Sequence, residues 1–252
     1  MIIDFHTHIL PPFVIRDRDI YVSKDLTLKA LYSDPKAPMA QANELIDAMD
    51  AARVDRAVVM GFGWTDPGLA REVNDYLLES ADRYSGRLVP FCSVNPTWGD
   101  IALQEVERCA RLGAKGVGEL HPDIQGFDLA DVKVIKPLVE VMRRHAMIML
   151  THTSEPVGHI YDGKGATGPS AVMGIVEQFP DIPIVCAHWG GGLPFYALMP
   201  EVAAVLSNTY LDTAASPLLY HQSVFSVVPQ LMRRDAILLG SDYPLLRLER
   251  LI

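Results

Sequence analysis

The chain has 252 residues, of which 49% are hydrophobic and 21% charged, and this length and composition predict one globular domain with a sizeable core. The net charge of −9 argues against a nucleic-acid binder, because the sequence has no basic stripe to neutralise phosphates. It shows no basic leader and no long apolar stretch, so we expect neither a signal peptide nor a membrane span. Cys92, Cys109 and Cys186 form no CxxC pair and favour a reducing compartment, which predicts a cytoplasmic location.

Short apolar runs alternate with amphipathic segments along most of the chain. The predicted strands cover residues 2–8, 56–60, 88–94, 115–120, 146–153, 184–188, 209–214 and 236–240. The predicted helices cover residues 41–52, 67–83, 100–112, 131–144, a segment that ends near 179, a segment after 192 that ends at 206, and 218–233. This alternation predicts parallel strands joined by right-handed crossovers.

Eight such units predict an α/β fold, the (β/α)8 TIM barrel. An open doubly wound sheet is the alternative, and it is disfavoured because no Gly-x-Gly-x-x-Gly turn follows the first strand. The sequence ends at residue 252, where an eighth helix should begin, so we expect the final helix to be short or missing. Residues 9–40 contain four prolines and are predicted to form an irregular lid insertion within a single domain spanning residues 1–252.

Side chains that commonly bind metals follow five of the predicted strands. They are His6 and His8 on the first strand, then Glu119, His152, His188 and Asp242 after the fourth, fifth, sixth and eighth strands. A strand has a side-chain period of two, so His6 and His8 project from the same face. Active sites of such barrels lie at the C-terminal ends of the strands, so we expect all six to converge there. Their nitrogen and oxygen atoms suit a divalent cation, zinc first, with manganese, iron or nickel as alternatives.

Three stretches around these residues resemble the amidohydrolase superfamily, in its amidohydrolase-related branch: residues 4–8, 187–191 and 240–244. That branch contains metal-dependent hydrolases and decarboxylases of the aminocarboxymuconate-semialdehyde and resorcylate types. The resemblance covers nearly the whole chain and implies a barrel with a metal site. Glu119 departs from the mononuclear pattern and is similar to the strand-four glutamate that bridges two metals in TatD-type hydrolases, which implies one or two ions.

The leading hypothesis for function is hydrolysis of a small-molecule amide, ester or lactone by a metal-activated water. Asp242 would orient this water and take its proton, and His152 and His188 would complete the metal site or polarise the substrate carbonyl. The alternative is non-oxidative decarboxylation, in which Asp242 assists protonation of the substrate carbon. The same ligands serve both reactions, so their spacing does not separate them. A third hypothesis is a non-catalytic metal-binding barrel, which predicts a closed coordination sphere.

Further residues are candidates for supporting roles around the site. Candidate substrate contacts are Trp189, Lys164 and Arg247. Asp4 shares the inward face of the first strand and is predicted to be a buried hydrogen-bond acceptor. His121 is predicted to lie at the surface or to face the substrate. The apolar segment 193–199 fits either the core or a homodimer interface.

Overall fold

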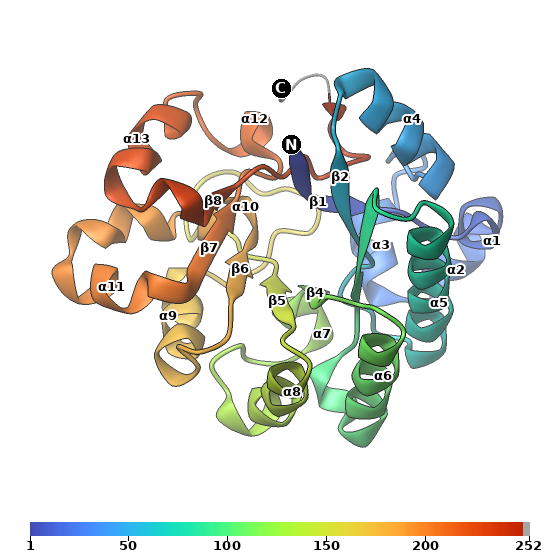
Figure 1. Cartoon of the computed structure of the whole chain (residues 1–252), viewed down its shortest axis with the longest axis horizontal. Helices are drawn as coiled ribbons and strands as arrows, with labels where there is room; N and C mark the ends of the chain where they lie inside the picture. The colour runs from blue at the N-terminus through green and yellow to red at the C-terminus, as the bar shows by residue number, and fades with distance from the viewer. Residues whose placement is uncertain (249–252) are drawn as a thin grey trace.

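The computed structural model describes residues 1–248 and contains one eight-stranded sheet whose strands are adjacent in sequence order. The strands are β1 (Ile3–His8), β2 (Arg56–Met60), β3 (Leu88–Cys92), β4 (Gly116–Leu120), β5 (Ile148–Thr151), β6 (Ile184–Cys186), β7 (Thr209–Asp212) and β8 (Ile237–Leu238). Each strand pairs in parallel with the next. Figure 1 shows the strands at the centre of the molecule with the helices around them.

The first strand also meets the chain around β8, which closes the sheet into a barrel. The amide of Phe5 donates to the carbonyl of Leu239 at 2.7 Å, and Thr7 forms a parallel bridge with Tyr243. These bonds satisfy edges that an open sheet would leave exposed. The predicted TIM barrel is confirmed, and the alternative of an open doubly wound sheet is wrong.

Five helices of the outer layer agree with the prediction to within a residue or so at the predicted ends. They are α4 (Ala42–Ala52), α5 (Pro67–Arg83), α6 (Asp100–Arg111), α8 (Val132–Arg144) and α9 (Pro169–Gln178). Side-chain caps fix the first residue of several of these helices. Asp66 caps α5 by accepting from the amide of Leu69 at 2.7 Å, and Asp131 caps α8 by accepting from Lys133 at 2.9 Å.

Two long helices predicted in the last third of the chain are each divided into shorter pieces. The segment after 192 forms η2 (Leu193–Leu198), α11 (Pro200–Val205) and η3 (Leu206–Asn208), and the segment 218–233 forms α12 (Ser216–Leu219) and α13 (Val224–Leu231). Met199 precedes a proline, which disfavours helical backbone, and it is extended with φ −86° and ψ 119°. Tyr220 is extended as well and ends α12. Predicting one helix in each segment was therefore wrong.

Residues 9–40 are largely helical, so the prediction of an irregular segment was wrong. They form α1 (Pro12–Arg16), α2 (Arg18–Lys24) and α3 (Leu26–Tyr32). Pro12 lies in the first turn of α1, where its missing N–H removes no helical hydrogen bond. Val14 and Leu28 are fully buried in a cluster with side chains of α4 and α5, and this packing stabilises the short helices. A lid function for this segment stays a prediction.

Asp25 ties α3 to the loop that follows β2. Its buried carboxylate caps α3 by accepting from the amides of Thr27 and Leu28 at 2.9 and 3.1 Å. The second carboxylate oxygen accepts from the amides of Thr65 and Asp66 at 2.7 and 3.0 Å. One side chain therefore satisfies four backbone donors from two segments that are distant in sequence.

The core has an inner layer within the barrel and an outer layer between strands and helices. The inner layer includes Val58, Met60, Phe91, Leu150 and Val185. It fills the barrel interior, so the barrel is a packed scaffold with its polar site at the strand ends.

In the described part of the chain, no helix is long and apolar enough to cross a membrane. The expectation of a short or missing eighth helix falls on residues 249–252 and lies outside the described residues. In the segment 193–199, Leu193 is buried whereas Phe195 and Leu198 are exposed, so the segment belongs partly to the core and partly to the surface. A homodimer through this surface stays a prediction, as does a single domain spanning residues 1–252.

Replacing Asp25 with alanine should lower the free energy of unfolding by about 3 kcal/mol, because four backbone amides lose a charged acceptor at a buried position. For a chain of this size, the midpoint of thermal unfolding should fall by roughly 6–12 °C, measured by scanning calorimetry. Asp17→Ala is the matched control, because Asp17 precedes α2 without a side-chain bond to that helix. Equal losses in the two variants would contradict the role assigned to Asp25.

Candidate metal site and its pocket

The C-terminal ends of the strands form the floor of a pocket with a volume of about 420 Å³. Its lining includes five of the six predicted ligands: His8, Glu119, His152, His188 and Asp242. The sixth, His6, is fully buried beside them. The structure therefore brings together all six side chains that the strand-end positions predicted to converge.

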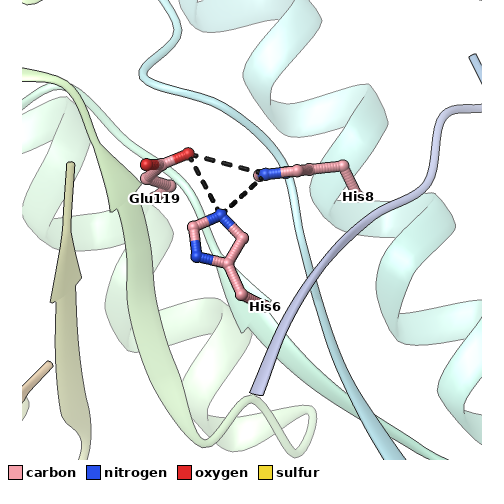
Figure 2. Close-up of side chains that lie close together, drawn as sticks. All are labelled: His6, His8 and Glu119. Atoms are coloured by element: carbon pink, nitrogen blue, oxygen red, sulfur yellow. Dashed lines mark hydrogen bonds and ion pairs between the residues drawn. The ribbon is translucent and has the colours of Figure 1, made fainter. Parts of the chain in front are cut away.

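One group of donor atoms forms around His6 and His8. Their Nε2 atoms lie 3.0 Å apart, and the Oε2 atom of Glu119 lies 3.7 Å from the first and 3.5 Å from the second. Figure 2 shows the three side chains facing one another. The Oδ1 atom of Asp242 approaches from β8, at 3.6 Å from His6 Nε2 and 3.5 Å from His8 Nε2.

The hydrogen-bond partner of each Nδ1 atom shows which ring nitrogen of His6 and of His8 carries the proton. The Nδ1 atom of His6 donates to Oδ2 of Asp212 at 2.8 Å, and Nδ1 of His8 donates to the carbonyl of Gly61 at 3.2 Å. A carboxylate and a carbonyl only accept, so Nδ1 carries the proton of each neutral ring. Both Nε2 atoms then point their lone pairs at each other and at Glu119. Facing lone pairs repel unless a cation lies among them, so the donor set fits a divalent metal.

A second group of donor atoms shares Glu119. Its Oε1 atom lies 3.0 Å from Nδ1 of His152 and 3.8 Å from Nε2 of His188. The Nδ1 atom of His188 lies 3.2 Å from the carbonyl of Ala214, which leaves the lone pair of a neutral ring on Nε2. Glu119 therefore stands between two groups of three potential ligands, one toward each of its oxygens.

The backbone presents His188 and Asp242 through left-handed conformations, with φ of 56° and 65°. Such φ values are uncommon outside glycine and recur at functional sites. Glycines follow His188, and at Gly191 a Cβ atom would come within 2.5 Å of the carbonyl oxygen of Ser154. The glycine-rich sequence after β6 thus permits the tight turn α10 (Ala187–Gly190) that carries the histidine.

Charges within the cluster perturb its titratable groups. Burial opposes ionisation of Glu119, yet the positive charges and hydrogen bonds of His6 and His152 hold its pKa well below the ordinary value. Burial also opposes ionisation of Asp242, but a bond from His8 and the nearby histidine charges lower its pKa to about 2. Burial lowers the pKa of His6, but Asp212 and Glu119 outweigh it and raise that pKa well above the ordinary value. The carboxylates thus favour a positive charge at this centre, as a proton or as a metal cation.

Asp212 is a functional residue that the sequence analysis missed. It ends β7 and is fully buried. One oxygen binds the ring of His6, and the other accepts from the amides of His188 and Ala214 at 2.9 and 3.0 Å. It orients His6 and holds the turn that carries His188. The available signal was an acidic residue at the end of an apolar strand, the same position that pointed to the other candidate ligands.

Asp4 confirms the prediction of a buried acceptor. Its Oδ1 atom accepts from the amides of His6 and Ser241 at 3.1 and 3.0 Å, which links β1 to the loop that carries Asp242. Burial raises the pKa of the Asp4 carboxyl to about 6, although bonds from Ser241 and His6 oppose that shift.

His121 is buried and lines the pocket, so of its two predicted positions the surface one is wrong. Its ring stacks on His152 with centroids 4.2 Å apart and an interplanar angle of 9°. Its Nε2 atom donates to the carbonyl of Gly163 at 2.9 Å. Burial and the charge of His152 lower its pKa to about 4, so His121 is neutral at pH 7.

The three candidate substrate contacts lie outside the described lining of the pocket, and a substrate-binding role for them stays a prediction. Trp189 is fully buried in the outer core, where its Nε1 atom donates to Ser216 at 2.7 Å. The Nζ atom of Lys164 donates to two carbonyls of its own loop, both at 2.9 Å. Arg247 is exposed. The sequence showed that these three residues follow predicted strands, but it did not show in which direction their side chains point.

Solved decarboxylases share this fold. The 5-carboxyvanillate decarboxylase of Novosphingobium aromaticivorans, solved with manganese and 3-methoxy-4-hydroxy-5-nitrobenzoic acid, matches with a TM-score of 0.79 and 18% identity over 98% of this chain and 88% of that chain. A 2,6-dihydroxybenzoate decarboxylase from Rhizobium matches with a TM-score of 0.70 and 17% identity over 98% and 89% of the two chains. At these identities the likeness shows the fold.

Two curated proteins are similar in sequence. The 2-amino-3-carboxymuconate-6-semialdehyde decarboxylase of Dictyostelium discoideum is 22% identical over 96% of this chain and 81% of that protein. The 6-methylsalicylic acid decarboxylase of Penicillium expansum is 24% identical over 70% of this chain and 63% of that protein. Both relatives are named decarboxylases, so the leading expectation of a hydrolase is wrong. The error has a physical reason, because one ligand set serves either reaction.

A profile of the amidohydrolase family matches residues 3–251, which is nearly the whole chain. The match agrees with the closed barrel and with the histidine and carboxylate cluster at its strand ends. It also confirms the resemblance drawn from the motifs around His6, His188 and Asp242. The chain is an enzyme that belongs to the amidohydrolase family.

Proposed function

We propose that this chain is a metal-dependent, non-oxidative decarboxylase of small aromatic or unsaturated carboxylic acids. The observation that carries the proposal is the ligand cluster at the floor of a pocket whose walls are largely apolar. The names of both curated relatives support the reaction. The manganese in a structural neighbour supports dependence on a divalent metal.

The walls above the cluster suit a flat, unsaturated acid. They include Leu31, Phe62, Leu218, Leu219 and Leu245. Contact with such side chains stabilises a bound ligand, because it removes the ligand's apolar body from water. Apolar surroundings also favour the loss of uncharged carbon dioxide over the retention of a charged carboxylate.

We assign the cation to His6, His8, Glu119 and Asp242, whose facing atoms lie 3.0–3.7 Å apart. Glu119 and Asp242 together carry two negative charges, which one divalent cation balances, so we propose one ion per chain. Zinc and manganese both suit this set of imidazole and carboxylate ligands. When bound, the cation supplies Lewis-acid stabilisation of negative charge on substrate oxygens.

The reaction breaks the bond between a substrate carbon and its carboxylate, leaves the electron pair on that carbon and releases carbon dioxide. A proton then takes the vacated position, and we assign its delivery to Asp242, which lines the pocket. With a pKa of about 2, Asp242 is ionised at neutral pH and first takes a proton from a substrate hydroxyl or from solvent. His188, held by the carbonyl of Ala214, orients the substrate beside it.

Manganese-loaded protein should release carbon dioxide from members of a panel of hydroxybenzoates and 2,4-dienoates. Asp242→Asn should lower this rate by about 10²–10⁴-fold, because it removes the proton carrier. Asp235→Asn is the matched control and should leave the rate unchanged, since Asp235 is 76% exposed and lies outside the described lining of the pocket. Hydrolysis of esters or amides without any carbon dioxide release would refute the proposal.

Elemental analysis of purified protein should find about one zinc or manganese ion per chain, and His8→Ala should bind almost none, because one Nε2 ligand is lost. Circular dichroism would verify that the variant is folded. Two ions per chain, falling to one in Glu119→Gln, would instead show that Glu119 bridges two metals.

Asp212→Asn should weaken metal binding by about 10–100-fold, because the partner that orients His6 loses its charge. Competition with a chelator measures this change, and Asp34→Asn is a matched control at the pocket mouth. Protons compete with the cation for His6, whose pKa is raised, so wild-type affinity should strengthen as the pH rises through and above the ordinary titration range of histidine. Affinity that is independent of both pH and Asp212 would place the cation elsewhere.

A further inference from the structure

Charge is distributed unevenly in the pocket. In the described lining, the carboxylates outside the ligand cluster are Asp34 and Asp162, both exposed at the mouth. The rest of the upper wall is largely apolar, as at Leu31, Leu218 and Leu245. A second carboxylate on a ligand would therefore meet apolar groups or a carboxylate of its own sign. Apolar contact and repulsion from the two carboxylates would both disfavour a second negative charge at this position.

Arg18 and Lys164 contact residues that line this pocket, and backbone carbonyls hold both side chains. The guanidinium of Arg18 lies 5.6 Å from the ring of the lining residue Tyr32 and donates to its carbonyl at 2.9 Å, with further bonds to carbonyls of residues 34–37. The Nζ atom of Lys164 bonds to two carbonyls of its own loop. Turning either side chain toward a ligand would break these bonds.

The two imidazoles above the cluster, those of His121 and His159, have different surroundings. The N–H group of His121 is bound to the carbonyl of Gly163, so it does not face a ligand oxygen. The ring of His159 is exposed and lies against Tyr161, with centroids 5.4 Å apart. The described lining contains no lysine or arginine, so positive charge for a ligand is concentrated at the floor, at the proposed cation.

We infer that the acid decarboxylated here carries one carboxylate, the one that leaves, on an otherwise uncharged and apolar body. The inference rests on the proposed function and narrows its substrate class, excluding dicarboxylic acids as good substrates. The leaving carboxylate is neutralised at the floor, and the apolar body fills the space between α3 and the wall formed by α12. Of the compounds named for the two curated relatives, 6-methylsalicylic acid has one carboxylate and belongs to this class, whereas 2-amino-3-carboxymuconate-6-semialdehyde has two.

Two matched pairs of acids test the inference on manganese-loaded protein. The first pair is 2-hydroxybenzoate and 2-hydroxyterephthalate, and the second pair is 2,4-hexadienoate and 2,4-hexadienedioate. In each pair the second acid has one more carboxylate, at the far end of the molecule. Calorimetry should show the monocarboxylate binding at least about tenfold more tightly, a difference of roughly 1.4 kcal/mol. Carbon dioxide should be released from a monocarboxylate and not from its matched dicarboxylate.

A cation added to the wall should reverse this preference. Leu218 lines the pocket and is 51% exposed, so the surface tolerates a longer side chain there. Leu218→Arg should tighten dicarboxylate binding by about tenfold through a charge-assisted pair, whereas Leu218→Gln, of similar length without charge, should not. If Leu218→Arg does not fold, Leu245→Arg carries the same test, since Leu245 is 50% exposed.

The outcomes separate this inference from the proposal beneath it. Equal or tighter binding of the dicarboxylates, or carbon dioxide release from them alone, overturns the inference and leaves the decarboxylase proposal intact. No binding and no carbon dioxide release with any of the four acids overturns the proposed function, and the inference falls with it.

Discussion

The facing lone pairs of His6 and His8 are the constraint on which the site depends. Two imidazole nitrogens lie 3.0 Å apart in a buried position, beside the carboxylate of Glu119. Without positive charge this arrangement repels itself. Asp212 and the carbonyl of Gly61 enforce it by holding the ring protons on the opposite side. The surrounding structure therefore maintains a place that favours a positive charge, as a proton or as a metal cation.

The barrel makes this arrangement possible because its strands are parallel and their C-terminal ends share one rim. Ligands that are far apart in sequence, such as His8 and Asp242, approach to 3.5 Å there. Above the rim, α3 and α12 supply apolar walls instead of further charge. The pocket is thus divided into a charged floor and an apolar upper part, and that division underlies both the reaction and the substrate class proposed here.

Much of the fold was predictable because each strand is a short apolar run followed by a polar residue or a turn. The same pattern located all six side chains of the cluster, since a residue at the end of a barrel strand reaches the rim regardless of its neighbours. The pattern did not lead to Asp212, although Asp212 also ends a strand, because no histidine lies near it in the sequence. It also failed for residues 9–40, whose short helices are stabilised by packing on α4 and α5 more than by local propensity.

The sequence by itself determined the order of the strands, the family and the residues that gather at the rim, because these follow from local periodicity and from position along the chain. Only the tertiary structure decided where individual side chains point. It buried Trp189 in the outer core, bound Lys164 to its own loop and placed Asp212 behind His6. Such directions depend on contacts between segments distant in sequence, and local sequence patterns do not encode them.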